Sequence, residues 1–331
     1  HYPLRRQRQM CIRDRVKHGV VVRIIYDDFG SINAIPPHFI KEMENIGIQT
    51  RRFNPYKPML SVIMNDRDHR KILVIDGRVA HTGGYNIADE YINKKIRFGY
   101  WKDAGIRVEG ECVNSFTTMF LEMWNYINKD NAVHDEYLNP HNTFSQSEKS
   151  GFVQPFCDSP LEHDDVGENL YVSIISRAKK YVYIFTPYLI LGTELSHAMI
   201  SAARSGVDVR IVVPKIPDKK LIYLQTKANF RPLIEAGVRI YLYTPGFIHS
   251  KCIVADDDTA IVGTCNLDFR SMYWNFEDFV YMYRTQCIGK IKEDAIETFA
   301  VSEEVCEEST NDISFAGRLL QSILQLFAPL L

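Results

Sequence analysis

One eight-residue pattern, H-x-K-x-x-x-x-D, occurs twice in this chain of 331 residues. In each copy a glycine follows seven positions after the aspartate, and an asparagine follows three positions after the glycine. The members are His69, Lys71, Asp76, Gly83 and Asn86 in the first copy, and His249, Lys251, Asp256, Gly263 and Asn266 in the second. Agreement at five matched positions far exceeds chance, so the chain is predicted to contain two related halves.

Each copy has the pattern of a strand, a turn and a returning strand. The segments "KILVID" (71–76) and "KCIVAD" (251–256) are apolar and rich in β-branched residues, and Asp76-Gly77 is a hairpin signal. Side chains at i and i+2 of a strand share a face, so each histidine and lysine are expected to project together. Each aspartate falls on the other parity, beside the turn, and is interpreted as holding the hairpin. The glycines are expected to allow close approach of a ligand.

Two His–Lys pairs that face one another suit the chemistry of a phosphodiester. One imidazole attacks phosphorus, the other protonates the leaving group, and the two ammonium groups hold the non-bridging oxygens. This division of roles predicts a two-step displacement through a phosphohistidine intermediate. A metal site is the alternative, but lysine is a poor metal ligand and no H-E-x-x-H or C-x-x-C spacing occurs. We therefore expect metal-independent chemistry and no cofactor.

At these residues the sequence resembles the phospholipase D superfamily, and more closely its bacterial cardiolipin synthase branch. The resemblance extends from about Val16 to the C-terminus. The segments that carry it, besides the two motifs, are "IIYDDFGS" (24–31), "GGYNIADEYI" (83–92), "WKDAGIRVEG" (101–110), "EAGVRIYLYTPGFIHSK" (235–251) and "GTCNLDFRSMYWNFE" (263–277).

The resemblance implies an α/β fold of two similar domains, each a mixed sheet flanked by helices, related by a pseudo-two-fold axis with the active site between them. It implies phosphatidyl transfer between two phosphatidylglycerol molecules, giving cardiolipin and glycerol. A phospholipase D or a phosphatidylserine synthase would differ only in using water or serine as the acceptor. An inactive phospholipid-binding fragment is the alternative of another class.

The resemblance also assigns two carboxylates and two catalytic roles. Asp103 and Glu277 match family positions where a carboxylate bonds the back nitrogen of its histidine. By the same resemblance His69 is the expected nucleophile and His249 the general acid. Ala104-Gly105, which follows Asp103, departs from the bulkier and often histidine-containing version of the branch.

Charge and hydropathy narrow the range of partners. The net charge is −2, and residues 1–15 alone contribute five arginines and one aspartate. The remaining body is therefore acidic, which argues against a nucleic-acid partner. Phosphatidylglycerol and an anionic membrane surface are the expected partners, at the cytoplasmic face of a bacterial cell membrane. No stretch of 18 or more apolar residues occurs in the chain. The seven cysteines show no paired spacing and are expected to be reduced.

Composition suggests three segments. Residues 1–15 resemble translated adapter sequence, with a basic juxtamembrane arm as the alternative; 16–148 form an N-terminally truncated first domain, and 149–331 form a second domain that ends in an amphipathic helix. Helices are predicted at 112–128 and 219–236, the latter ending at Gly237. The segments "PYLI" and "PKIPDKK" follow predicted strands and are expected to line a lipid channel.

Overall fold

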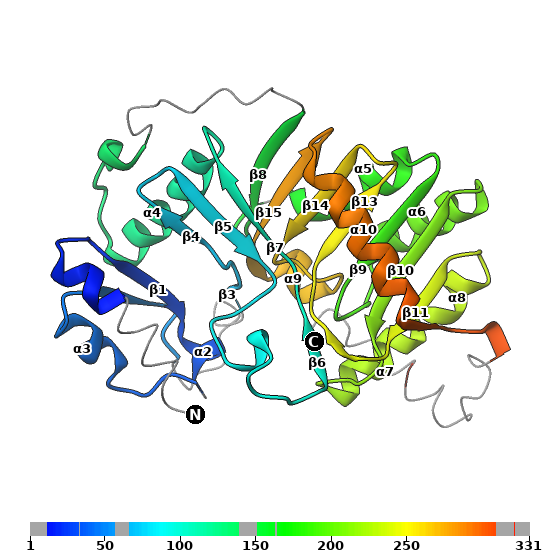
Figure 1. The fold of residues 1–331 in the computed structure, drawn as a ribbon, viewed down its shortest axis with the longest axis horizontal. Coiled ribbons are helices and arrows are strands. Elements are labelled where there is room, and N and C mark those ends of the chain that lie inside the picture. Colours follow the sequence, from blue (N-terminus) through cyan, green and yellow to red (C-terminus); the bar gives the residue numbers. More distant parts are fainter. Residues whose placement is uncertain are drawn as a thin grey trace. The chain divides into compact units, whose positions relative to one another are not determined.

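The chain folds into two compact units, one formed by residues 1–68 with 120–134 and the other by residues 69–119 with 135–331. The computed structural model describes residues 12–32, 34–56, 66–138, 151–162, 164–308 and 321 (Figure 1). The expected C-terminal amphipathic helix, apart from Gln321, lies outside the described residues, as do residues 1–11 of the basic segment. The described helices include none with the length and hydrophobicity of a bilayer-spanning segment.

The smaller unit is built on two parallel strands joined through helices. Strand β1 (Arg23–Asp27) pairs with β2 (Gln49–Phe53), and α2 (Asp28–Ser31), α3 (Phe39–Glu44) and the short β3 (Arg67–Asp68) complete the first part. The end of α4 (Val113–Asn128) adds Trp124, whose ring lies beneath the guanidinium groups of Arg23 and Arg51. The predicted helix at 112–128 is confirmed, and its Phe116 and Trp124 are buried.

The larger unit contains a mixed sheet with the strand order β16-β11-β10-β9-β13-β14-β15. Strand β8 pairs with β15 along residues 277–283. Its strands are β8 (Phe152–Asp158), β9 (Tyr181–Phe185), β10 (Asp208–Pro214), β11 (Arg239–Tyr243), β13 (Cys252–Ala255), β14 (Thr259–Gly263), β15 (Asn275–Tyr283) and β16 (Ser302–Glu304). Strands β9, β10 and β11 run parallel, whereas β13, β14 and β15 are antiparallel neighbours.

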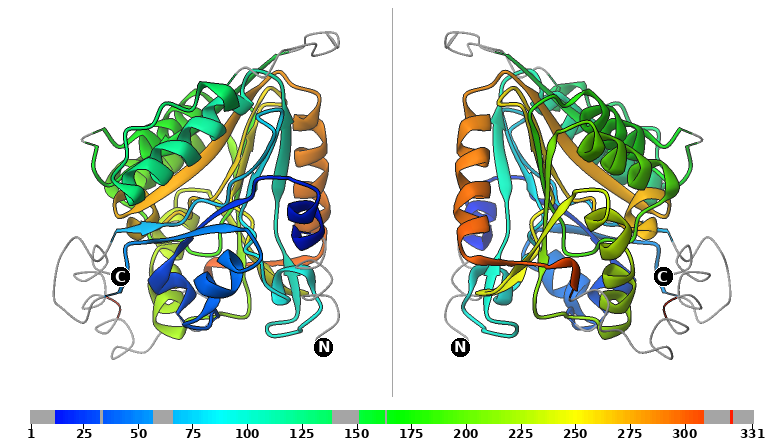
Figure 2. Two further views of the ribbon diagram at one scale, coloured as in Figure 1. Left: turned by 90° about the vertical axis from the view of Figure 1, so that its left-hand side faces the viewer. Right: turned by 90° about the vertical axis from the view of Figure 1, so that its right-hand side faces the viewer.

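Helices cover both faces of this sheet. They are α5 (Val166–Arg177), α6 (Thr193–Arg204), α7 (Lys220–Ala228), α8 (Phe230–Ile234), α9 (Phe269–Tyr273) and α10 (Cys287–Ala300). Alternate residues of β9 face opposite sides: Val182 and Ile184 pack with α5 and α6, whereas Tyr183 and Phe185 pack with Phe299 of α10. Figure 2 shows α10 on one side and α5 and α6 on the other. The expected α/β class, with mixed sheets flanked by helices, is confirmed.

Both motif hairpins form as predicted. Strand β4 (Leu73–Ile75) pairs with β5 (Val79–Gly83), which pairs in turn with β7 (Gly105–Glu109). The turn residues Asp76 and Gly77 have φ of 54° and 62°, and Asp256 and Asp257 have φ of 52° and 66°. Positive φ at both central positions characterises the hairpin turn whose twist matches that of the strands. The second copy therefore adopts this turn without a glycine.

Two local predictions need correction. The helix expected at 219–236 is broken at Asn229 into α7 and α8, because Pro232 has no N–H for the carbonyl of residue 228 and its ring would clash there. The histidines and lysines of both motifs do not lie within strands. They occupy the connections that follow β3 and β12 (Gly246–Ile248) and precede β4 and β13.

Candidate active site

The imidazoles of the two motifs are each bonded to a carboxylate from the opposite motif region. The Nδ1 atom of His69 lies 2.9 Å from both carboxylate oxygens of Glu277, and Nδ1 of His249 lies 2.8 Å from Oδ2 of Asp103. The pairs are thus crossed with respect to the sequence, where each acid follows the other histidine. A carboxylate on Nδ1 fixes the tautomer and leaves Nε2 for chemistry.

Main-chain bonds explain how the sequence produces this crossing. The N–H of His69 donates to the carbonyl of Phe276 at 2.9 Å, and the N–H of His249 donates to the carbonyl of Lys102 at 2.7 Å. Each of these carbonyls belongs to the residue immediately before the partner acid. The second bond continues the parallel pairing of β12 with β6 (Tyr100–Lys102), in which residue 248 lies opposite residue 102. The backbone therefore sets each imidazole beside its carboxylate.

Glu277 is fully buried and its acceptors are satisfied. The hydroxyl of Thr264 donates to Oε2 at 2.5 Å, and the side-chain amide of Asn275 donates to Oε1 at 3.0 Å. Burial alone would raise the pKa of Glu277, but the neighbouring His69, Lys71 and Thr264 lower it to about 2. Glu277 is therefore a carboxylate throughout the neutral range and a rigid support for its histidine.

The motif lysines bond to their own histidines in the same manner. Nζ of Lys71 donates to the carbonyl of His69 at 2.5 Å, and Nζ of Lys251 donates to the carbonyl of His249 at 2.5 Å. Lys251 is only 1% exposed, and burial lowers its pKa to about 7, with repulsion from Lys71 adding to the effect of burial. The two ammonium groups thus lie within electrostatic reach of one another and of a shared anion.

Burial favours the neutral form of both imidazoles. Burial and the charge of Lys251 together lower the pKa of His249 to about 3, against the opposing effect of Asp103. Burial also lowers the pKa of His69, against the attraction of Glu277. A neutral imidazole with its Nε2 lone pair free can attack phosphorus or accept a proton. The two histidines are therefore competent as nucleophile and base.

Asp278, which sequence reasoning missed, ties the first motif to the same strand. It is fully buried next to Glu277, accepts a hydrogen bond from the Thr82 hydroxyl at 2.5 Å, and accepts one from the N–H of Lys71 at 3.3 Å. Burial raises the pKa of Asp278 to about 6. The sequence signal for this residue is the pair of adjacent acids in "NFEDFVYMY". Neighbouring residues of a strand face opposite sides of the sheet, so two acids there place one carboxyl group on each face.

Aromatic rings enclose His249. The ring centroids of Trp101 and Tyr91 lie 5.1 and 5.4 Å from that of His249, and Phe247 lies 6.1 Å away. Trp101 also stacks against Phe247 at 4.8 Å, and its indole N–H points toward Asp103 at 3.4 Å. This wall keeps His249 largely dry, which is the physical origin of its lowered pKa.

The motif glycines serve close packing of protein backbone rather than of a ligand. A Cβ atom on Gly83 would lie 2.3 Å from the carbonyl oxygen of Ala104, and one on Gly263 would lie 2.4 Å from that of Asp278. Gly263 also donates its N–H to the carbonyl of Lys251 at 3.2 Å. Both glycines therefore hold the returning strand against the segment that carries an acid.

The motif asparagines occupy unequal environments. Asn86 is exposed and donates to the hydroxyl of Tyr91 at 2.7 Å, whereas Asn266 is buried and donates to the hydroxyl of Ser271 at 3.1 Å. The Oδ1 atom of Asn266 is buried and has no hydrogen-bond partner among the described residues. Only this second asparagine thus has an acceptor within the protein interior left for a bound molecule.

The motif aspartates lie at the turns, as the strand parity predicted. Asp76 is exposed in the turn between β4 and β5. Asp256 accepts hydrogen bonds from the main-chain N–H groups of residues 179, 180 and 181 at 2.7 to 3.0 Å. Burial opposes its ionisation, but these bonds lower the pKa of Asp256. Its observed contacts are structural, fastening the second hairpin to the start of β9.

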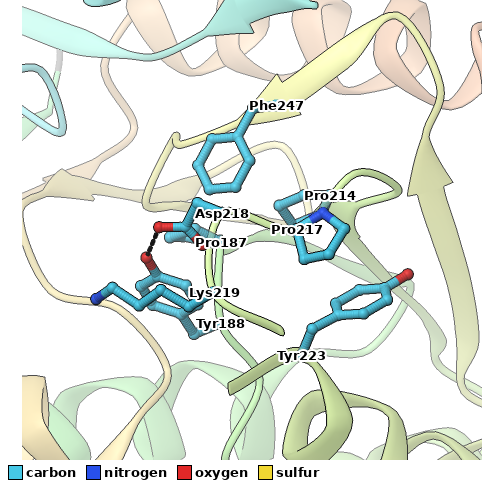
Figure 3. A pocket seen from close by; sticks show the side chains of 8 residues that line it. All are labelled: Pro187, Tyr188, Pro214, Pro217, Asp218, Lys219, Tyr223 and Phe247. Carbon is cyan, nitrogen blue, oxygen red and sulfur yellow. Dashed lines mark hydrogen bonds between the residues drawn. The ribbon is translucent and has the colours of Figure 1, made fainter. Parts of the chain in front are cut away.

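The two segments expected to line a lipid channel converge on one recess. It is a shallow recess, too narrow in this structure to hold a water molecule, at the ends of β9 and β10 (Figure 3). The lining residues are Pro187, Tyr188, Pro214, Pro217, Asp218, Lys219, Tyr223 and Phe247. The Tyr188 hydroxyl donates to Asp218 at 2.6 Å. Phe247 connects this recess to the aromatic wall around His249.

Comparison with known proteins agrees with this geometry. The family model described as "Cardiolipin synthase, PLD-like domain" matches residues 9–124 and 171–299. The chain is 37% identical over 332 residues to a cardiolipin synthase of Alkalihalophilus pseudofirmus, covering 100% of this chain and 65% of that protein. It is 47% identical over 320 residues to an uncharacterized protein of Streptococcus mutans, covering 97% of this chain and 69% of that protein.

A solved structure shares the fold. The phosphatidylserine synthase of Haemophilus influenzae superposes with a TM-score of 0.67 at 14% identity, covering 93% of this chain and 80% of that one. Fold and paired motifs define the phospholipase D superfamily. Within it, the chain belongs to the cardiolipin synthase, phospholipase D-like domain family. The chain spans about two thirds of the length of the curated relatives it matches.

Proposed function

We propose that this site transfers a phosphatidyl group between two phosphatidylglycerol molecules, forming cardiolipin and glycerol. The observation that carries the proposal is the pair of crossed His–carboxylate contacts with a lysine beside each histidine. Relatives with this family's domains are named cardiolipin synthases, which supports the same substrate. The supporting set comprises Gly83, Asn86, Asp103, Gly263, Asn266 and Glu277 around the His and Lys pairs.

In the first step Nε2 of His69 attacks phosphorus. The phosphorus–oxygen bond to the glycerol headgroup breaks, and His249 donates a proton to the departing oxygen. Burial lowers the pKa of His249 to about 3, so the anionic phosphodiester must first raise it. A negative charge placed between Lys71 and Lys251 has this effect, because it offsets their repulsion of a proton.

In the second step the glycerol hydroxyl of another phosphatidylglycerol attacks the phosphatidyl-histidine. His249, now neutral, accepts the hydroxyl proton and the phosphorus–nitrogen bond to His69 breaks. His69 is then neutral again, and His249 again carries the proton that it held when the first substrate was bound. Lys71 and Lys251 stabilise the charge on the non-bridging oxygens in both steps. This cycle needs a membrane substrate, and we propose that it takes place at the cytoplasmic face of a bacterial membrane. We also propose that the first phospholipase D-like domain ends at residue 148 and the second begins at residue 149.

The test is incubation of the chain with phosphatidylglycerol vesicles, followed by mass spectrometry of the lipids. Cardiolipin with an equal amount of glycerol supports the proposal. Phosphatidic acid would indicate a phospholipase D, and phosphatidylserine formed only with added serine would indicate a phosphatidylserine synthase. A phospholipid-binding fragment would bind the vesicles and form no product. The His69→Ala variant is the control for contaminating enzymes.

A further inference from the structure

Two exposed segments beside the recess combine apolar and basic side chains. The first, residues 87–100, carries Ile87 at 94% exposure, Ile96 at 79% and Tyr100 at 57%. The second, residues 215–221, carries Ile216 at 42% and Leu221 at 57%. Single exposed apolar residues are ordinary on protein surfaces. Several large exposed apolar side chains on two adjoining segments are not explained by chance. We call these two segments, residues 87–100 and 215–221, the rim.

Contacts show that both segments adjoin the same residue of the site. Phe98 of the first segment packs on Phe247 with ring centroids 5.8 Å apart. Pro217 and Lys219 of the second segment line the recess together with Phe247. Phe247 in turn lies 6.1 Å from His249. In Figure 1 the loop before β6 and the start of α7 both lie at the lower edge of the ribbon. The rim therefore borders the approach to the catalytic histidine.

The first segment is held firmly enough to present its side chains. Asn93 adopts a left-handed conformation with φ of 57°, and its side chain exchanges two hydrogen bonds with the backbone of Trp101. The N–H groups of Lys94 and Lys95 both point to the carbonyl of Asp89. Because its backbone is bonded in this way, the outward position of Ile96 is part of the fold.

The charge of the rim is opposite to that of the whole chain. The first segment has Lys94, Lys95 and Arg97 against two acids, whereas the chain carries a net charge of −2. The second has three lysines against one acid, and one of these lysines, Lys215, pairs with Glu303 outside the rim. Asp218 is engaged by the Tyr188 hydroxyl. Lys94 and Lys95 form no ion pair with any residue in the described part of the chain. Free cations beside exposed isoleucines favour an anionic bilayer surface.

We propose that the rim docks the protein onto an anionic phospholipid bilayer, with Ile87 and Ile96 entering the headgroup region. The inference rests on the proposed function for its choice of partner. Docking at this position would bring headgroups to the approach to His249. A second copy of the chain or another protein would need only the apolar side chains, whereas a bilayer of phosphatidylglycerol uses both the apolar side chains and the cations.

The experiment is flotation of the full chain with vesicles of equal parts phosphatidylglycerol and phosphatidylcholine, and with phosphatidylcholine alone. The Ile87→Ser/Ile96→Ser variant should bind the anionic vesicles at least about tenfold more weakly than the wild type. Lys94→Gln/Lys95→Gln should weaken binding by about fivefold or more, and only to the anionic vesicles. The matched control is Ile296→Ser/Val301→Ser, on α10 and at its C-cap, where the exposures are 51% and 48%.

Unchanged binding of the rim variants, or equal loss in the α10 control, overturns the inference. So does a wild-type dimer that the Ile87→Ser/Ile96→Ser variant abolishes while vesicle binding persists. Flotation requires no turnover, so it separates this inference from the proposed function. His69→Ala should float like the wild type even though it forms no product, and all variants should share one thermal unfolding midpoint.

Discussion

The two motif hairpins carry the same residues on different supports. Strand β13 is fully buried and paired on both sides, by β9 and β14. Strand β4 is paired by β5, no described strand pairs its other edge, and Leu73 and Ile75 are 55% and 47% exposed. The side chain of His69 is 27% exposed and that of His249 is 10%. The two motifs therefore have the same chemical groups but differ in their exposure to solvent.

The difference suggests how a pseudo-symmetric site obtains two roles. Both motifs have polar anchors, the Asp278–Thr82 and Asp278–Lys71 bonds in the first and the Asp256 bonds to the start of β9 in the second, but only the second lies on a fully buried strand. Because His249 is less exposed to water than His69, the charge of a bound substrate should change its pKa more. The more exposed His69 is easier to reach for attack on phosphorus. The following predictions test this assignment.

The largest effect is expected from the histidines themselves. His69→Ala should abolish the phosphatidyl-enzyme adduct and reduce turnover by about 10⁴-fold or more. His249→Ala should still form the adduct slowly from a p-nitrophenyl phosphodiester, because that leaving group needs no proton. Acid quenching followed by peptide mass spectrometry locates the adduct. An adduct found on His249 in the wild-type protein would reverse the assignment.

The crossed carboxylates should separate the two steps. Glu277→Gln should slow adduct formation about a thousandfold with any substrate, because it leaves His69 in the wrong tautomer. Asp103→Asn should slow transfer from phosphatidylglycerol similarly but spare adduct formation from the p-nitrophenyl ester. Rapid-quench kinetics on both substrates measures the contrast. If each acid instead affected the histidine of its own motif, the crossing would have no catalytic meaning.

The dry environment of the second hairpin predicts a pH dependence. The pKa of Lys251 lies at about 7 in the free site, so its charge is present below that pH and lost above it. We expect kcat/KM to fall about tenfold per pH unit above neutrality. Lys251→Arg should remove this limb, since a guanidinium keeps its charge. An unchanged limb in that variant would show that another group titrates.

The polar anchor of the first hairpin should have a moderate effect. Asp278→Asn and Thr82→Val should each reduce turnover about tenfold by displacing the segment that bears Lys71. The double variant should be little worse than either single one, because both remove the same bond. A double-mutant cycle on kcat and on thermal unfolding tests this coupling. Additive losses in kcat would mean that Asp278 positions nothing through Thr82.

The smallest effect should follow removal of divalent metal ions. In the proposed mechanism Lys71 and Lys251 supply the positive charge that many phosphoryl-transfer enzymes take from a metal ion. EDTA should therefore change turnover of a monomeric short-chain substrate by less than about twofold. Turnover that is lost on chelation and restored by one specific divalent ion contradicts the metal-independent proposal. A short-chain substrate avoids effects of divalent ions on vesicle aggregation.

Sequence patterns predicted elements and spacing well because both depend on local chemistry. The hairpins, the helix ending near residue 128 and the strands from β9 to β11 follow from periodicity and turn residues. The break before Pro232 was also local and was overlooked. The crossing of the acids was not foreseeable, because it depends on β6 pairing with β12 across 146 residues. Asp278 escaped notice because buried acids are uncommon in apolar strands.

The crossed carboxylates also affect when the site becomes complete during synthesis. A nascent chain that ends before β15 already contains His69 and Lys71, yet it lacks the acid that orients His69. Likewise, a His249 made without the first half would have no Asp103 to hold its ring. Neither half can therefore present an oriented imidazole to phospholipid by itself. In the proposed mechanism, reactivity therefore arises only when one folded chain contains both motifs.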